Sequence, residues 1–113
     1  MIATTFVREF TLALPEVTEV PHFDKAAFKV RGKIFMTMHE KSKTANLKLT
    51  PANQDIFSLF DKTIIYPVPN KWGLQGWTTI ELQTVLPDMF KEALKTAYCN
   101  VAPKELAEKI EFN

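Results

Sequence analysis

Residues 26–49 read AAFKVRGKIFMTMHEKSKTANLKL, and apolar and polar side chains alternate along them in three runs. A period of two residues is typical of antiparallel strands that bury one face. The pattern predicts strands at Ala26–Val30, Ile34–His39 and Ala45–Leu49, after a first strand at Val17–Phe23. The side chains expected on the buried face are Phe28, Val30, Ile34, Met36, Met38, Ala45, Leu47 and Leu49, and those expected on the opposite face are Lys29, Phe35, Thr37, His39, Asn46 and Lys48.

The turn after Val30 decides which residues share a face. A two-residue loop, Arg31-Gly32, would pair Val30 with Lys33 and place the neighbouring apolar sets on opposite sides of the sheet. A three-residue loop, Arg31-Gly32-Lys33, keeps both sets on one side. We therefore expect the odd loop.

The segments on either side of this region predict the rest of the fold. Apolar residues recur at helical spacing over 4–13, from Thr50-Pro51 to about residue 61, and over 87–98, and Pro103 can open a last short helix. Residues 64–66 suit a short or edge strand because prolines follow, and residues 77–82 alternate again. The order α-β-β-β-β-α-β-β-α-α predicts a single α+β domain over residues 1–113. We expect an antiparallel sheet of about five strands, packed by helices on one face.

The rare residues of the chain gather in residues 70–77, NKWGLQGW, which hold both tryptophans and two of the three glycines. Glycine allows backbone conformations closed to other residues, so this stretch predicts a shaped corner that leads into the last strand. Alternation along that strand places Trp77, Thr79 and Glu81 on one face and Ile80 and Leu82 on the other. Trp77 is thus expected on the same outer face as Lys29 and Lys48.

The charge of the chain is unevenly distributed. The net charge is only +1, which by itself argues against strong binding to nucleic acid. From Lys25 to Lys48, however, seven basic residues stand against one acidic residue, so this segment carries +6 and the remainder −5. Residues 25–48 are therefore basic, whereas the rest of the chain is acidic.

Several kinds of chemistry are disfavoured. With only three glycines, the chain has neither a P-loop nor a dinucleotide-binding loop. The single cysteine, Cys99, cannot form an internal disulfide, and neither histidine has the spacing of a metal site. We expect no catalytic residues, no metal and no cofactor, so the protein is not expected to be an enzyme. No secretory signal or membrane-spanning run is visible, which favours the cytoplasm.

Four motifs occur in an order that resembles the MmcQ/YjbR family over roughly residues 6–101. They are Leu14-Pro15-Glu16, the 28–35 hairpin FKVRGKIF, the 47–51 junction LKLTP, and Asn70-Lys71 leading to Trp77. The resemblance implies a small cytoplasmic bacterial α+β protein with a curved antiparallel sheet, usually described as DNA-binding. In the family, the lysine and the tryptophan of the motif that corresponds to Asn70-Lys71 and Trp77 are closer together in sequence than they are here. A role that the family gives to this corner therefore transfers less well to Trp72.

Together, the basic segment and the resemblance predict a DNA contact surface. Lysines would face phosphates, Arg31 would act at the hairpin tip, and an outer aromatic residue would stack on bases. Lysines are, however, also ordinary on the solvent face of a sheet. The expected contact residues are Lys29, Arg31, Lys33, Lys48, Lys71 and Trp77.

Two alternatives remain open. The open sheet face could serve protein–protein interaction or homodimerisation, with Phe35, Met38 and Trp77 as anchors. A small-molecule site near the tryptophan loop is the other alternative, although no substrate is identified.

Overall fold

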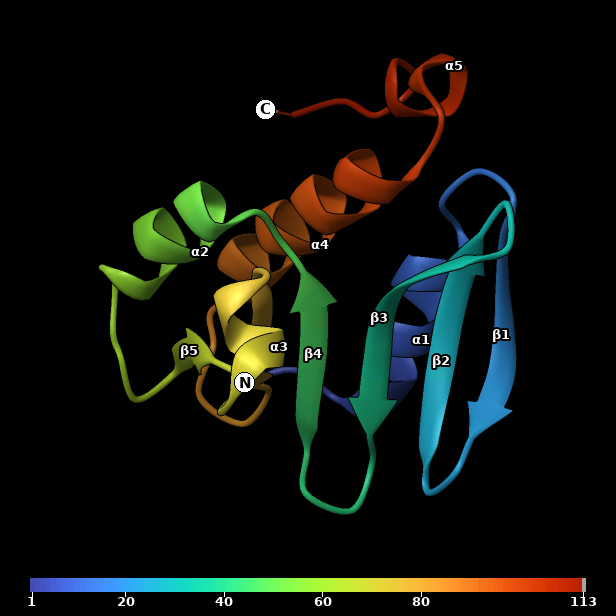
Figure 1. Ribbon diagram of the computed structural model, residues 1–113. Helices are drawn as coiled ribbons and strands as arrows, with labels where there is room; N and C mark the ends of the chain where they lie inside the picture. The colour runs from blue at the N-terminus through green and yellow to red at the C-terminus, as the bar shows by residue number, and fades with distance from the viewer. Residues whose placement is uncertain (113) are drawn as a thin grey trace.

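The computed structural model describes residues 1–112 and contains one six-stranded antiparallel sheet with helices packed on it (Figure 1). The sheet order is β1-β2-β3-β4-β6-β5, so the short β5 is an edge strand, as expected. The predicted α+β fold is confirmed, with six strands where about five were expected. The elements are α1 (Thr4–Leu12), β1 (Val17–His22), β2 (Lys25–Val30), β3 (Lys33–His39), β4 (Thr44–Lys48), α2 (Pro51–Ser58), β5 (Ile65–Pro67), α3 (Lys71–Leu74), β6 (Trp77–Glu81), α4 (Pro87–Val101) and α5 (Lys104–Ala107).

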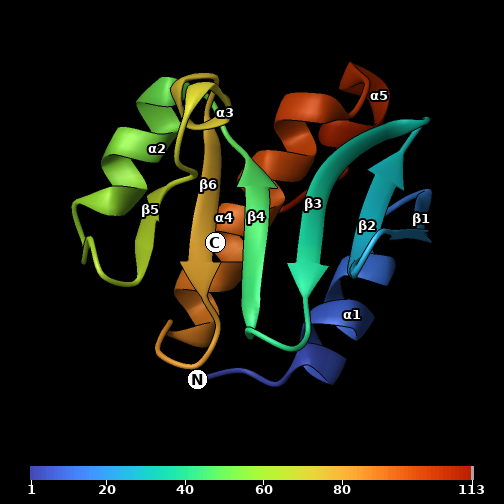
Figure 2. The ribbon, with the colours of Figure 1, turned by 60° about the horizontal axis from the view of Figure 1, so that its bottom comes forward.

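The long helices lie on one face of the sheet. Helix α4 packs on β3 and β4, and α1 packs near β1. Figure 2 shows both helices behind the sheet and the opposite face toward the viewer. That opposite face, which we call the outer face, is where any ligand of the sheet would have access. No helix within residues 1–112 is long and apolar enough to cross a membrane.

Helix α4 supplies the centre of the core. Proline at its first position is compatible with a helix start because the first amide needs no intrahelical acceptor. Its buried face includes Tyr98, whose ring meets that of Phe35 edge-on at 5.5 Å between centroids. The Tyr98 hydroxyl donates a hydrogen bond to the carbonyl oxygen of Pro15 at 2.7 Å, which ties α4 to the turn before β1. The apolar side chains that α4 buries are Phe90, Ala93, Leu94, Ala97 and Tyr98.

The hairpin of β2 and β3 differs from expectation. Val30 pairs directly with Lys33, so the loop has two residues, and Arg31 and Gly32 both have positive φ, of 50° and 79°. Two positive φ angles in a two-residue loop match a type I′ turn, which suits the twist of the strands. The predicted three-residue loop is therefore wrong.

A β-bulge restores the pattern that the short turn would otherwise invert. The register passes from Phe28 opposite Met36 to Lys29 opposite Ile34, which leaves Phe35 as the extra residue of β3. Phe35 is fully buried against α4, whereas Ile34 shares the outer face with Lys29. The predicted faces of Phe35 and Ile34 are thus both wrong, because the alternation restarts at the bulge.

The corner of residues 70–77 is built around a short helix, α3, that the sequence pattern did not predict. The side chain of Asn70 accepts a hydrogen bond from the Trp72 amide at 3.0 Å and caps this turn. Gln54 of α2 is buried beneath it, and its amide nitrogen donates to the carbonyl oxygens of Gly73 at 3.0 Å and Trp77 at 3.1 Å. A single side chain therefore fixes the corner to the helix that precedes it.

Candidate nucleic-acid interface

The outer face carries positive charge. Lys25 and Lys29 alternate onto it from β2, and Lys48 does so from β4, where it pairs with Trp77. Among the strand residues of this face within residues 1–112, Glu81 is the one acidic side chain. Its carboxylate accepts a hydrogen bond from the Tyr66 hydroxyl. The open face thus presents more free lysines than carboxylates.

A hollow of about 480 Å³ lies on this face. Its volume is within the range of small-ligand sites, about 300–1,000 Å³. Both tryptophans of the chain line it, and Trp77 lies on the outer face as predicted, while Trp72 is 51% exposed. The lining residues are His22, Lys25, Ile34, Thr37, Asn46, Val68, Trp72 and Trp77.

Two of the expected contact residues, Lys48 and Trp77, are cross-strand partners at one corner of the outer face, and a third, Lys71, begins the adjoining helix α3. The ammonium group of Lys48 donates to the carbonyl oxygen of Gln75 at 2.6 Å, which holds it beside α3. Lys71 is the exposed first residue of α3, and Trp77 lies opposite Lys48 on the neighbouring strand. This corner can offer two ammonium groups and an indole ring to one ligand.

Lys33 and Arg31 are placed differently from these residues. Lys33 pairs with Val30, whose side chain is buried, so Lys33 lies at the end of the sheet on the helix-facing side. Arg31 donates to both carboxylate oxygens of Glu16 at 2.6 and 3.0 Å and pairs with Glu105 of α5 at 3.2 Å. These partners raise the pKa of Arg31, and its guanidinium in turn lowers the pKa of Glu16. Arg31 thus links the hairpin tip to the C-terminal helix, and its charge is largely neutralised.

Of the residues that line the hollow, only Trp77 was among the expected contact residues, and the others include Lys25, Ile34 and Asn46. Lys25 has the same strand parity as Lys29, so alternation could have found it. Asn46 was expected on the outer face but had no assigned role. Ile34 lies on this face only because of the bulge at Phe35, and the local sequence pattern does not indicate that bulge.

The anchors expected for a protein-binding face are mostly inaccessible. Phe35 and Met38 are fully buried in the core. Only Trp77 of the three expected anchors remains on the outer face. An apolar protein contact on this face therefore lacks two of the side chains on which that alternative rested.

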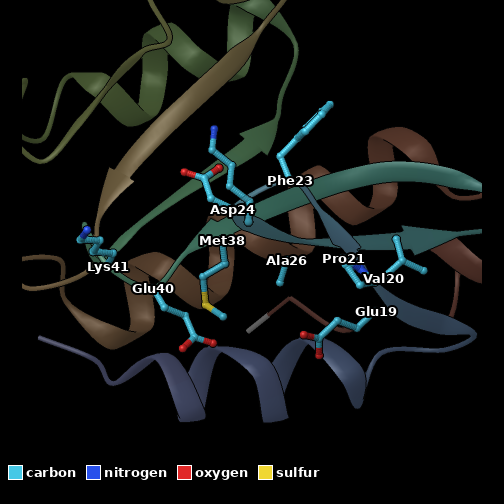
Figure 3. Close-up of a pocket in the computed structure, with 10 residues that line it drawn as sticks. Glu19, Val20, Pro21, Phe23, Asp24, Ala26, Met38, Glu40 and Lys41 are labelled. Carbon is cyan, nitrogen blue, oxygen red and sulfur yellow. The ribbon is translucent and has the colours of Figure 1, made fainter.

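A second hollow, of about 600 Å³, is lined by residues of β1, β2, β3 and the turns that follow β1 and β3 (Figure 3). Glu19 of β1 and Glu40, in the loop after β3, point toward α1 in this view. Arg8 of α1 binds both carboxylates, with its Nε 3.0 Å from Glu19 and a terminal nitrogen 2.5 Å from Glu40, and these contacts raise the pKa of Arg8. Arg8 already neutralises both carboxylates, so these ion pairs serve primarily to hold α1 against the sheet.

Asp24, His39 and Ser42 form a hydrogen-bonded chain between two turns. The Ser42 amide donates to Nδ1 of His39 at 3.1 Å, which makes Nδ1 an acceptor and leaves the proton of the neutral ring on Nε2. Nε2 then donates to Asp24 at 3.0 Å and helps to lower the pKa of that carboxyl group. Because Nδ1 already accepts from the Ser42 backbone, His39 serves first to join the β1–β2 turn to the β3–β4 loop.

Nucleophilic and metal chemistry have little support in the described chain. Burial raises the pKa of the Cys99 thiol, which disfavours the thiolate. Within residues 1–112, no three His, Cys, Asp or Glu side chains lie close enough together to hold a metal ion.

The Tyr66–Glu81 pair gives a testable pH dependence. The Glu81 carboxylate accepts the Tyr66 proton in a hydrogen bond and raises the pKa of Tyr66 to about 12, while burial raises that of Tyr98, the other tyrosine of the chain. Because the folded pKa lies above the unfolded value of about 10, this contribution to stability is present below pH ~10 and is lost as the pH rises toward 12. In a spectrophotometric titration, Glu81→Gln should let one tyrosine ionise at lower pH. An unchanged titration curve would contradict the hydrogen bond.

Comparison with known proteins places the fold among solved structures. A family model described as YjbR matches residues 12–100. A Deinococcus radiodurans protein with a DUF419 domain has a TM-score of 0.81 to this chain at 20% sequence identity, covering 96% of this chain and 88% of its own. A Pseudomonas syringae protein has a TM-score of 0.62 at 17% identity, covering 86% and 96%. No curated protein matches the sequence. At these identities the structural likeness shows the fold alone.

Proposed function

The chain belongs to the YjbR family, and we propose that it is a non-catalytic nucleic-acid-binding protein that contacts DNA through the outer face of its sheet. The observation that carries the proposal is the corner where Lys48 pairs with Trp77, a residue that lines the hollow, beside the short helix α3 that begins at Lys71. Ammonium groups bind backbone phosphates, and an indole ring offers a stacking surface for a base. The DNA binding implied by the family resemblance agrees with this chemistry.

The contact surface consists of the lysines whose charge no carboxylate neutralises. Lys25 and Lys29 extend the positive charge from the corner across the face toward β1. Lys33 and Arg31 contribute less, because Lys33 lies on the helix-facing side and Arg31 is paired with Glu16 and Glu105. The proposed surface is therefore shifted away from the hairpin tip and toward the tryptophan corner.

Fluorescence anisotropy with labelled DNA tests this proposal. The variant Lys29→Glu/Lys71→Glu should bind at least about tenfold more weakly at low salt, and the slope of log K against log salt should fall by about 2. The matched control is Lys104→Glu/Lys109→Glu, which makes the same change in net charge at exposed positions in and after α5. Absence of binding by the unmodified protein at low salt, or equal losses in both variants, would refute the proposed surface.

A small molecule in the same hollow is the remaining alternative, favoured only by the volume of the hollow. Both tryptophans line it, so a ligand that binds there should alter the intrinsic tryptophan emission. A screen that shifts this emission while DNA at low salt leaves it unchanged would favour the small-molecule site over the nucleic-acid surface.

A further inference from the structure

The turn between β1 and β2 holds an aromatic residue in an unfavourable position. Phe23 is 95% exposed, and its φ of 59° lies in the left-handed region, which bulky residues rarely adopt. The ring gains little from burial, because its one close aromatic neighbour is His22, edge-on at 5.1 Å between centroids. A strained and exposed phenylalanine at a turn suggests a role in binding rather than in stability.

Phe23 lies on the β1–β2 turn, between the two hollows: it lines the hollow of about 600 Å³, and its ring meets that of His22, which lines the hollow on the outer face. His22 and Lys25, the residues on either side of the Phe23-Asp24 turn, both line the hollow on the outer face. Trp77 and Trp72 line the hollow from the side of β6 and α3. Aromatic rings therefore lie in the wall of this recess and on the turn that adjoins it.

The shape of this site selects among forms of nucleic acid. Proteins read a duplex by inserting a protruding helix or strand pair into a groove. A recess lined by residues of several strands does the opposite, because it admits a group from the ligand, and an unpaired base can enter where a stacked base pair cannot. The volume of about 480 Å³ leaves room for one such group.

The lining of the hollow suits the faces and edges of a base. Trp77, Ile34 and Val68 provide apolar surface. The side-chain oxygen of Asn46 accepts a hydrogen bond from the Thr79 hydroxyl at 2.8 Å, so the amide NH₂ of Asn46 is left to donate to a ligand. Lys25 lines the same hollow and can contact a phosphate.

We infer that the hollow takes an unpaired base and that the protein prefers single-stranded nucleic acid, with one base against Trp77 and the next against Phe23. The inference rests on the proposed function and names the form of nucleic acid that the same face binds. Stacking on aromatic side chains tolerates any base, so sequence preference is weak. Phosphates between the stacked bases face the lysines of β2 and β4.

Phe23→Asn is the most informative variant. Asparagine tolerates the left-handed conformation and removes the exposed ring, so the folded protein should be at least as stable as before. Loss of one stacking surface should nevertheless weaken binding to a single strand at least fivefold. Trp77→Phe, which keeps an aromatic ring in the wall, should cost less than Trp77→Ala.

The probes are a labelled oligothymidylate of about 12 nucleotides, within the site sizes of about 4–16 nucleotides seen for single-strand binders, and a duplex of the same length. We expect the single strand to bind more tightly, to quench tryptophan emission, and to lose affinity in Phe23→Asn. Equal or tighter binding of the duplex, or full affinity in Phe23→Asn, would overturn the preference for single strands while leaving the proposed function intact. Absence of binding by either probe at low salt would overturn both.

Discussion

Gly76→Ala should destabilise the protein so strongly that little folded protein survives. A Cβ atom at this position would lie 1.9 Å from the carbonyl oxygen of Leu49 and 2.7 Å from its carbonyl carbon, and the φ of +107° is itself unfavourable for alanine. The backbone cannot move away freely, because the Leu49 amide donates to the Gly76 carbonyl at 3.1 Å. We expect a loss of at least about 4 kcal/mol, a large part of the ~5–15 kcal/mol that stabilises a typical domain. Urea denaturation followed by circular dichroism measures it.

Gly32→Ala is the matched control. Gly32 also has a positive φ, of +79°, but an added Cβ would meet no atom within 4 Å. Its cost should therefore be the conformational strain alone, on the order of 1 kcal/mol. If the two variants had similar midpoints of unfolding, the close approach of Gly76 to Leu49 would not be the reason for glycine at that position.

The contrast between these glycines shows where sequence reasoning succeeds and where it stops. The run of residues 70–77 could be predicted as a shaped corner because it concentrates glycine and tryptophan. The reason for glycine at position 76, however, is its close approach to the carbonyl group of Leu49, which precedes α2 in the chain whereas Gly76 follows it. A contact between distant segments leaves no local pattern, so the sequence indicated the corner but not what it packs against.

The strands and helices were predictable for the opposite reason. Their apolar side chains repeat at the period of the element, as in α4, where the side chains that are buried follow the helical spacing. The two-residue period of a strand is interrupted where a β-bulge adds a single residue. At Phe35 the bulge reverses the faces, which moved Ile34 into the hollow and Phe35 into the core.

The candidate site was predictable only in part, because charge patterns do not reveal ion pairs. Lys29, Lys48 and Trp77 share the outer face as alternation required. Arg31 was grouped with them on the basis of its position at the hairpin tip. Its partners, Glu16 and Glu105, lie at sequence positions that no spacing rule connects to it.

Gln54→Glu should destabilise the protein in a pH-dependent way. The Gln54 amide nitrogen donates to the Gly73 and Trp77 carbonyl oxygens and to the Thr78 hydroxyl, at 3.0, 3.1 and 3.2 Å. A carboxylate oxygen in its place cannot donate and would face two buried carbonyl groups, at a cost of about 3 kcal/mol at neutral pH. Protonation restores one donor, so the folded-state pKa of the new Glu should lie above its usual value of about 4.3.

The sign of this dependence distinguishes the Gln54→Glu effect from a simple loss of packing. A pKa raised by folding means that Gln54→Glu is least destabilised below pH ~4 and loses stability as the pH rises through the folded-state pKa. Gln54→Met, of similar length but without a donor, should be destabilised by a nearly constant amount over the same range. The measurement is the difference in free energy of unfolding between each variant and the unmodified protein at several pH values. Parallel curves for the two variants would mean that the donated hydrogen bonds of Gln54 do not hold the tryptophan corner in place.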